Sequence, residues 1–380
     1  MRYYLIAGEA SGDLHASNLM QELKKTDPGA EFRCWGGDLM QAAGGVLVRH
    51  YRDLAYMGFL EVVMNLRTIM HNLSFCKEDI IRFKPDAVIL IDYPGFNLRI
   101  AEFAHQKGFK VIYYISPQVW AWKKSRVYGI RKNVDKMLVI LPFEQEFYRG
   151  YDFKVDFTGH PLLDVVNRSS AYPDPGAFRA ANQLGGKPII AVLPGSRKQE
   201  IRRMLPVMVA LSGRFTGYDF VVAGAPSIEP SFYRHITGIH GPAILFGQTH
   251  ELLRYAHAAL VTSGTATLET ALFGVPQVVC YKGGSVSYAI ARRIVDVKFI
   301  SLVNLVMDLQ VVKELIQGDF NQENLEKELK LILEESNRSR IIAEYDLLRE
   351  KLGGEGASRR AAAAIREFLG VGRRAQGVEL

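Results

Sequence analysis

Residues 258–281 read AALVTSGTATLETALFGVPQVVCY, and they set the fold class of the chain. The stretch contains one charged residue, Glu269, but Gly264, Gly274 and Pro276 interrupt it. A membrane-spanning helix needs about 20 predominantly apolar residues in succession, so this stretch is too interrupted to cross a bilayer. Apolar, β-branched runs at both ends and a helical pattern between them indicate strand, loop, helix and strand. That succession predicts a parallel sheet with right-handed crossovers.

The same alternation continues through both halves of the chain. In the first half the strand-like runs are 3–7, 87–91, 110–115, 136–141 and 155–158. In the second half they are 189–193, 220–223, 244–246, 259–262 and 278–281. Helical patterns lie between them, for example at 14–24 and 204–215. We predict an α/β protein with two Rossmann-like, doubly wound domains that face a cleft, followed by a C-terminal helical tail.

A change in composition marks the join between the predicted domains. Residues 167–187 read NRSSAYPDPGAFRAANQLGGK, which is rich in turn-forming residues and poor in buried runs. After Asn321 the pattern becomes helical and charged. We therefore expect an N-terminal domain at 1–168, a C-terminal domain at 185–345 and a helical segment at 346–380.

Composition and charge narrow the class of protein. Of 380 residues, 48 % are apolar and 23 % are charged, which excludes collagen, coiled coils and wholesale disorder. The net charge of +7 indicates an anionic partner: nucleic acid, an acidic membrane surface or a phosphorylated substrate. The three cysteines have no paired spacing, so we expect a reducing compartment. The N-terminus has no signal-peptide pattern.

Two loops of the first half carry acidic residues directly after a strand. The loop GEASGD at 8–13 contains Glu9 and leads into a helix N-terminus, which favours anions. The alternative is an ordinary turn in which Asp13 caps the helix. Asp92 ends a buried strand, where poor solvation raises the basicity of a carboxylate and suits a general base. The alternative is that Asp92 caps the next helix.

Two loops of the second half are candidates for phosphate binding. In LPGSR at 193–197, Gly195 and Ser196 expose backbone N–H groups, and Arg197 either clamps phosphate or is simply solvated. In SGTATLE at 263–269, Glu269 either holds ribose hydroxyls or has a structural role. The small residues that open this second loop are Ser263, Gly264 and Thr265.

Several remaining features are ambiguous. Residues 123–136 hold six basic residues next to SPQVWAW at 116–122, which fits nucleic acid or anionic lipid but is also common on a solvated helix face. Residues 54–64 are apolar and form either core or a surface for acyl chains. His15 and His160 are either structural or acid/base residues. The sequence has no DxD motif and no metal-ligand spacing, so we expect neither a metal nor a cofactor.

The motifs in their order along the chain resemble those of lipid-A-disaccharide synthases, a family of inverting GT-B glycosyltransferases. The N-terminal motifs are GEASGD at 8–13, SPQVWAW at 116–122, LPF at 141–143 and GHP at 159–161. The C-terminal motifs are LPGSR at 193–197, SGTATLE at 263–269 and SLVNL at 301–305. The resemblance covers nearly the whole chain.

This resemblance implies a reaction of lipid A biosynthesis for lipopolysaccharide. UDP-2,3-diacylglucosamine and 2,3-diacylglucosamine 1-phosphate would give a β-1′,6-linked tetraacyl disaccharide 1-phosphate and UDP, with inversion and without a metal. Arg197, Glu269 and Asn304 would hold UDP, with the 263–265 loop at its phosphates.

The resemblance also bears on the general base. Glu9 and Asp92 fall on acidic positions of the family; Asp92 is our preferred base, and Glu9 and Asp86 remain candidates. Other members often have an acid where this chain has Gly95, so no role of that position carries over.

The resemblance further implies partners and a location. Its partners would be the two acylated substrates and an anionic membrane surface, with no nucleic acid. The chain would be cytoplasmic and peripheral to the inner face of the inner membrane of a Gram-negative-type bacterium. The C-terminal helix either packs back on its own N-terminal domain or exchanges within a homodimer.

Two alternative functions stay open on the sequence. The first is another UDP-sugar enzyme of the same fold, such as a UDP-N-acetylglucosamine 2-epimerase. The second is a non-enzymatic basic protein that binds membrane or nucleic acid.

Overall fold

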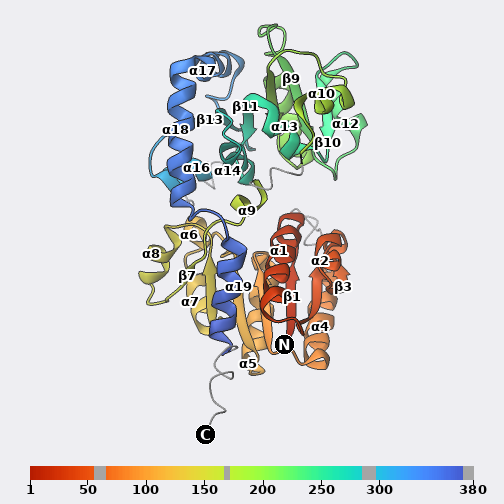
Figure 1. The fold of residues 1–380 in the computed structure, drawn as a ribbon, viewed down its shortest axis with the longest axis vertical. Helices are drawn as coiled ribbons and strands as arrows, with labels where there is room; N and C mark the ends of the chain where they lie inside the picture. The colour runs from red at the N-terminus through yellow and green to blue at the C-terminus, as the bar shows by residue number, and fades with distance from the viewer. Residues whose placement is uncertain (55–65, 167–171, 285–296, 371–380) are drawn as a thin grey trace. The chain divides into compact units, whose positions relative to one another are not determined.

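The chain divides into two compact units. Unit 1 is Met1–Asp164 with Leu352–Leu380, and unit 2 is Val165–Lys351 (Figure 1). The computed structural model describes residues 1–54, 66–166, 172–284 and 297–370. The apolar segment at 54–64 lies outside the described residues, apart from the backbone of Leu54.

Unit 1 is built on a seven-stranded parallel sheet in the order β3-β2-β1-β4-β5-β6-β7. Its strands are β1 (Arg2–Ala7), β2 (Glu31–Gly36), β3 (Val46–His50), β4 (Ala87–Ile91), β5 (Lys110–Tyr114), β6 (Lys136–Val139) and β7 (Asp156–Phe157). Its helices include α1 (Ala10–Thr26), α2 (Asp38–Ala42), η1 (Tyr51–Leu54), α4 (Leu66–Phe83), α5 (Pro94–Gln106), α6 (Val119–Trp122), α7 (Arg126–Asn133), α8 (Glu144–Arg149) and α19 (Ala357–Phe368). The short helix α9 (Leu162–Val166) contains the join to unit 2.

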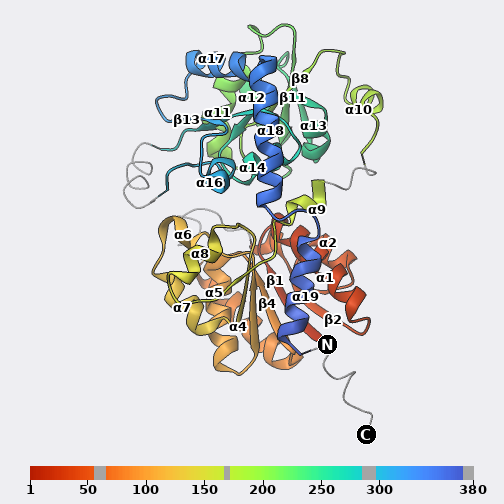
Figure 2. The same cartoon turned by 60° about the vertical axis from the view of Figure 1, so that its left-hand side comes forward.

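Helices cover both faces of this sheet because its central strands are apolar on both sides. Tyr4 and Ile6 of β1 pack into a core with α4, α5 and α7, while the alternate residues Tyr3 and Leu5 are also fully buried. Figure 2 shows α4, α5 and α7 on one side of the strands and α1 with α19 on the other.

A buried polar network joins the first core to α4. The indole of Trp35 donates to the Tyr4 hydroxyl at 2.8 Å, and that hydroxyl donates to Asp79 at 2.8 Å. Arg33 forms two hydrogen bonds of 2.7 Å with the two oxygens of Asp79. Because Asp79 is only 2 % exposed, this bidentate pairing offsets the cost of burying its charge.

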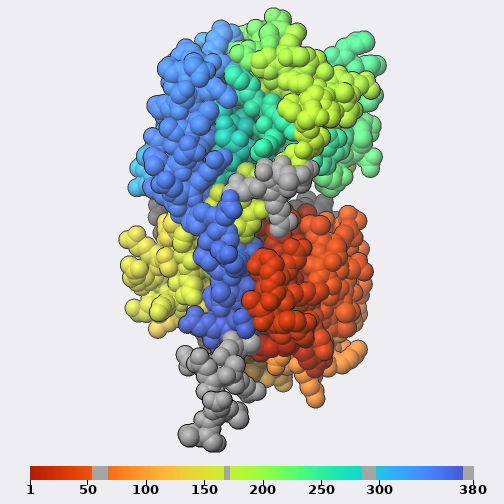
Figure 3. Space-filling model, in the orientation of Figure 1, coloured from red at the N-terminus to blue at the C-terminus, as the bar shows by residue number. Residues whose placement is uncertain are grey.

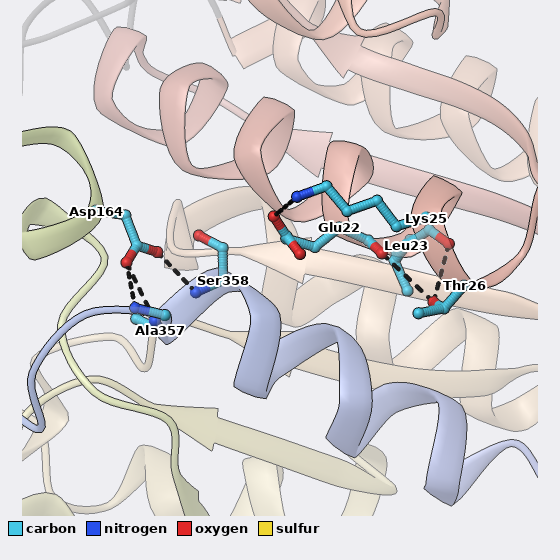
Figure 4. Close-up of polar contacts among 8 residues, drawn as sticks. Glu22, Leu23, Lys25, Thr26, Asp164, Ala357 and Ser358 are labelled. Atoms are coloured by element: carbon cyan, nitrogen blue, oxygen red, sulfur yellow. Dashed lines mark hydrogen bonds and ion pairs between the residues drawn. The ribbon is translucent and has the colours of Figure 1, made fainter. Parts of the chain in front are cut away.

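The C-terminal helix α19 returns to unit 1 and packs against α1 (Figure 3). The carboxylate of Asp164 caps its N-terminus, accepting from the backbone N–H of Gly356 at 2.6 Å and of Ser358 at 2.9 Å (Figure 4). A carboxylate satisfies the free N–H groups there and complements the helix dipole. Asp164 therefore fixes where α19 begins.

Unit 2 is built on a six-stranded parallel sheet in the order β10-β9-β8-β11-β12-β13. Its strands are β8 (Ile189–Leu193), β9 (Asp219–Gly224), β10 (Ala243–Phe246), β11 (Ala256–Thr262), β12 (Gln277–Tyr281) and β13 (Lys313–Ile316). Its helices include α10 (Pro175–Ala181), α11 (Lys198–Val209), α12 (Pro230–Thr237), α13 (Thr249–Tyr255), α14 (Thr265–Leu272), α16 (Leu302–Met307), α17 (Gln322–Leu333) and α18 (Glu335–Lys351).

The predicted α/β class with two Rossmann-like units and a C-terminal helix is confirmed. The stretch at 258–281 is strand β11, helix α14 and strand β12, as its pattern predicted. No helix in the described part of the chain is long and apolar enough to cross a bilayer.

Candidate active site

Two acidic side chains meet at the carboxyl edge of the first sheet. Glu9 follows β1 and Asp92 follows β4, and these strands are neighbours in which Ala7 pairs with Ile91. Parallel neighbours end at the same edge, so the topology brings together two residues that are far apart in sequence. Both residues reach the surface and are accessible to a substrate, although protein atoms crowd around the Asp92 carboxyl group and leave it little room for water.

The backbone at Asp92 adopts an unusual conformation. Asp92 and the next residue, Tyr93, have φ of 43° and 47°, in the left-handed region that aspartate tolerates better than most residues. The buried Asn97 amide donates to the Asp92 carbonyl at 2.8 Å, and the Tyr113 hydroxyl donates to the same carbonyl at 2.5 Å. A Cβ at Gly8 would overlap the Tyr93 ring, so this loop needs glycine there. These contacts hold the turn that presents Asp92.

The Asp92 carboxyl group is set up to exchange a proton near neutral pH. Removal of water by the surrounding protein, followed by the negative charge of Glu9, raises the pKa of Asp92 to about 7. The hydrogen bond to the backbone at Tyr93 acts in the opposite direction but is weaker. A base with a pKa near the working pH is well matched to general-base catalysis.

Asp86, the third acidic candidate, lies at the other end of β4. Its carboxylate accepts from the backbone N–H of Arg2 at 2.8 Å, at the start of β1. At about 3.3 Å per residue, β4 separates Asp86 from Asp92 by roughly 20 Å. The structure therefore brings Glu9 and Asp92 together and leaves Asp86 apart from them.

Asp13 of the GEASGD motif has a structural role in this fold. It is 3 % exposed and accepts from the backbone N–H groups of Gly37 at 2.8 Å and Met40 at 3.0 Å. It thus caps the neighbouring helix α2, whereas the N-cap of its own helix α1 is Glu9. Asp13 therefore caps a helix, as expected, but this helix is α2 and not α1.

The two histidines of the GEASGDLH and GHP segments are buried. Burial lowers the pKa of His15 to about 4 and that of His160 to about 3. Both imidazoles are therefore neutral at pH 7, and they do not enter the site that we assign.

In unit 2, the loop after β8 contains the groups predicted to bind phosphate, and the carboxylate of Glu200 contacts these groups. Gly195 has a φ of 105°, and the Arg197 side chain is 64 % exposed. Glu200 accepts from the backbone N–H of Ser196 at 3.2 Å and pairs with the Arg197 guanidinium at 3.0 Å. These are the groups expected to hold phosphate, so a diphosphate that binds here must share them with Glu200 or displace it.

The loop after β11 lies beside the loop after β8, because Leu193 of β8 pairs with Val261 of β11. Gly264 and Thr265 are exposed at the N-terminus of α14, where phosphate is favoured. The Ser263 hydroxyl donates to the Ile300 carbonyl at 2.9 Å and so anchors the loop that precedes α16.

Glu269 lies one turn into α14 and is half-buried. Its Oε1 is 2.6 Å from Nε2 of His250, which stands near the start of α13. The structure therefore gives Glu269 a histidine partner that the sequence analysis missed.

The side chain of Asn304 is fully occupied inside unit 2. Its amide nitrogen donates to the Val312 carbonyl at 2.9 Å and to Glu314 at 2.9 Å, while its oxygen accepts from the N–H groups of Val311 and Val312. Asn304 is 0 % exposed, and a primary amide has two donors and two acceptor positions. In this arrangement Asn304 holds the start of α16 and has no remaining group for a ligand.

Comparison with known proteins decides the family. A sequence profile described as lipid-A-disaccharide synthetase (LpxB) matches residues 3–368. The chain belongs to this family. The lipid-A-disaccharide synthase of Syntrophus aciditrophicus is 42 % identical over 369 residues, covering 94 % of this chain and 95 % of that protein. The synthase of Geobacter metallireducens is 36 % identical over 376 residues, covering 97 % of each chain. The chain is therefore a glycosyltransferase enzyme of lipid A biosynthesis.

Solved structures of other enzymes share the fold of this family member. The UDP-GlcNAc 2-epimerase of Neisseria meningitidis, bound to UDP-GlcNAc, superposes with a TM-score of 0.71 at 12 % identity and covers 97 % of this chain and 100 % of its own. The S. aureus MnaA–UDP structure gives a TM-score of 0.71 at 13 % identity and covers 97 % of each chain. At these identities the likeness shows the GT-B-type fold alone. Membership of the lipid-A-disaccharide synthase family decides against the two alternative functions, a UDP-N-acetylglucosamine 2-epimerase and a non-enzymatic basic protein.

Proposed function

We propose that the chain condenses UDP-2,3-diacylglucosamine with 2,3-diacylglucosamine 1-phosphate in an inverting, metal-independent displacement. Asp92 removes the proton of the acceptor's 6-hydroxyl, and that oxygen bonds to the anomeric carbon of the donor. The bond from this carbon to the diphosphate breaks, and its electron pair leaves with UDP. Attack opposite the leaving group gives the β-1′,6 linkage. The observation that carries this proposal is the position of the Asp92 carboxyl group beside Glu9 at the carboxyl edge of the first sheet, where its pKa is raised to about 7.

On the donor side, we propose that unit 2 binds the UDP moiety. The Ser196 and Arg197 N–H groups, the Arg197 guanidinium and the N-terminus of α14 supply positive potential for the departing diphosphate. Gly195 and Gly264 let the ligand approach the backbone, and Ser263 and Thr265 border the same loop. Glu269 accepts from the ribose hydroxyls, and Asn304 acts through the position of α16.

Acceptor-dependent release of UDP tests this function. We expect the enzyme to release UDP rapidly only when donor and acceptor are both present, and equally well with EDTA. UDP release from the donor alone at the same rate would indicate hydrolysis and contradict transfer. Loss of activity in EDTA, restored by a divalent cation, would contradict the metal-independent mechanism. An α linkage in the product, by NMR, would contradict inversion.

Replacing Arg197 by Ala should weaken UDP binding. Loss of a charge-assisted contact to phosphate corresponds to about 2 kcal/mol, or roughly thirtyfold in Kd, by isothermal titration calorimetry. Arg203→Ala, at an exposed position on the helix α11 that follows Arg197, is the matched control and should bind UDP as the parent does. Equal affinities for the parent and the Arg197 variant would refute the proposed clamp.

We also propose that unit 1 associates peripherally with an anionic membrane through an aromatic–basic patch on α6 and α7. This patch consists of Trp122, Lys123 and Arg126. The Trp122 side chain is 48 % exposed. The cations of Lys123 and Arg126 lie 4.4 and 5.7 Å from the Trp122 ring. An exposed aromatic ring beside cations suits the interface of an acidic bilayer, where the acylated substrates reside.

Binding to phosphatidylglycerol-containing vesicles tests the patch. Because each basic residue near an anionic surface contributes about 1 kcal/mol, the double variant Lys123→Ala/Arg126→Ala should bind these vesicles tenfold or more weakly, by about 2 kcal/mol. Raising the salt concentration should also weaken the binding of the parent protein to these vesicles. Lys327→Ala, at an exposed position in unit 2, is the control. Salt-independent binding that survives the double substitution would place the membrane contact elsewhere.

A further inference from the structure

The contact between His250 and Glu269 joins two helices of unit 2 at the proposed donor site. The Nε2–Oε1 distance is 2.6 Å, and the two side chains are 27 % and 21 % exposed. The imidazole also packs on the ring of Phe273, with ring centroids 5.4 Å apart. Thr265, Glu269 and Phe273 follow one another at intervals of four residues, so they share one face of α14. His250 therefore touches that face directly behind the phosphate-binding end of the helix.

We propose that His250 is a positioning residue for donor binding: it holds the Glu269 carboxylate in place for the ribose hydroxyls and offsets its negative charge. This inference rests on the proposed function, because it takes Glu269 as the residue that binds the ribose. His250 occupies Oε1, which leaves Oε2 to accept from the ribose. Without a cation beside it, a carboxylate close to a diphosphate would repel the donor.

The charged surroundings of His250 favour its protonated form. The hydrogen bond to Glu269 raises the pKa of His250 above its ordinary value, outweighing the opposite effect of partial burial. Glu251 on the same helix also raises it. The nearby Tyr172 packs on Phe273 and lies under the guanidinium of Arg254. The pKa of Tyr172 is itself raised by burial and by Glu251, so its hydroxyl stays neutral and does not compete for the proton.

Two substitutions separate the orienting role of His250 from its charge. His250→Ala removes both, and we expect the donor KM and the Kd for UDP to rise about tenfold while kcat stays within about twofold, because uniform binding is lost. His250→Gln keeps an N–H donor but cannot titrate. We expect it to restore UDP affinity to within about threefold of the parent at about pH 8.5, where the parent histidine carries less positive charge than at about pH 6. The matched control is His235→Ala, at an exposed position on α12.

The pH dependence tests the charge directly. As the pH rises from about 6 to about 8.5, the affinity of the parent for UDP, divided by that of the His250→Gln variant, should fall. Only the parent has a side chain at position 250 whose positive charge decreases as the pH rises. The Gln variant corrects for titration of the phosphates of UDP, which both proteins experience equally. A constant ratio over this range would overturn the role of the charge, and this test holds even if His250→Ala fails to fold.

Glu269→Gln distinguishes failure of this inference from failure of the proposed function. If Glu269→Gln weakens UDP binding and His250→Ala does not, the inference about His250 is wrong and the donor site stands. If Glu269→Gln leaves UDP binding unchanged, the assignment of Glu269 to the ribose is wrong, and the inference about His250 fails with it, whereas Arg197→Ala tests the phosphate-binding part of the donor site. If both substitutions weaken UDP binding, the double variant His250→Ala/Glu269→Gln should bind UDP with the same affinity as whichever single variant binds it less tightly, since His250 acts through Glu269. Additive losses would overturn the positioning role.

Discussion

Replacing Asp92 by Asn should lower kcat about 100- to 10 000-fold and leave the Kd for UDP unchanged. The size of the loss is that of a missing general base, and UDP affinity is retained because the donor groups lie in unit 2. Asn has nearly the shape of Asp and tolerates the left-handed backbone at this position, where φ is 43°. The loss should therefore reflect chemistry rather than misfolding. Steady-state turnover and calorimetry with UDP measure the two quantities.

Two companion variants decide among the three acidic candidates. Asp86→Asn, at the far end of β4, should turn over at the parent's rate. Glu9→Gln should remain active and shift the acid side of the pH profile to lower pH, because it removes a negative charge that raises the pKa of Asp92. A Glu9→Gln variant as inactive as Asp92→Asn would move the base to Glu9.

The pH profile of the parent has a defined direction. A pKa of about 7 means that Asp92 is mostly protonated below that pH and cannot accept the acceptor's proton. The value of kcat/KM should therefore rise through about pH 7 and level off above it. A profile that is flat between about pH 5 and about pH 9 would exclude a base with this pKa.

Replacing Asp79 by Asn should destabilise unit 1 by about 3 kcal/mol, because it leaves the Arg33 cation without its counter-ion beside the core. The Tyr4 hydroxyl loses its anionic acceptor as well. Urea unfolding followed by tryptophan fluorescence measures the effect. All three tryptophans of the chain lie in unit 1, so their emission reports on that unit alone.

The exposed pair of Arg349 and Asp346 provides a contrast. Their side chains are 38 % and 66 % exposed, and solvent screens such pairs. Asp346→Asn should change stability by less than about 0.5 kcal/mol. If Asp79→Asn unfolds at the same urea concentration as the parent, the buried network does not stabilise unit 1.

The central strands of both sheets could be predicted because they are buried on both faces. β1, β4 and β8 are continuous apolar runs, and their predicted positions match the structure closely. The sequence analysis missed β2, β3 and β13. β2 carries Glu31 and Arg33 among its apolar residues, while β3 and β13 are edge strands with little full burial. Strands of this kind lack the apolar run on which the prediction depended.

The site was predictable to the extent that it follows sheet topology. Glu9 and Asp92 come together because β1 and β4 are neighbours, as a doubly wound sheet requires. The roles of His250 and Asn304 were not accessible in this way. His250 lies 19 residues from Glu269 on a different helix, and only packing brings them together. Asn304 has its side chain saturated by groups around β13, which no motif reveals.

Mass spectrometry of the products tests the central claim most directly. The purified enzyme would be incubated with UDP-2,3-diacylglucosamine and 2,3-diacylglucosamine 1-phosphate in detergent, alongside the Asp92→Asn variant. We predict a tetraacyl disaccharide 1-phosphate and an equal amount of UDP from the parent, and almost none of either from the variant. UDP without the disaccharide, or the disaccharide formed equally fast by both proteins, would contradict the account.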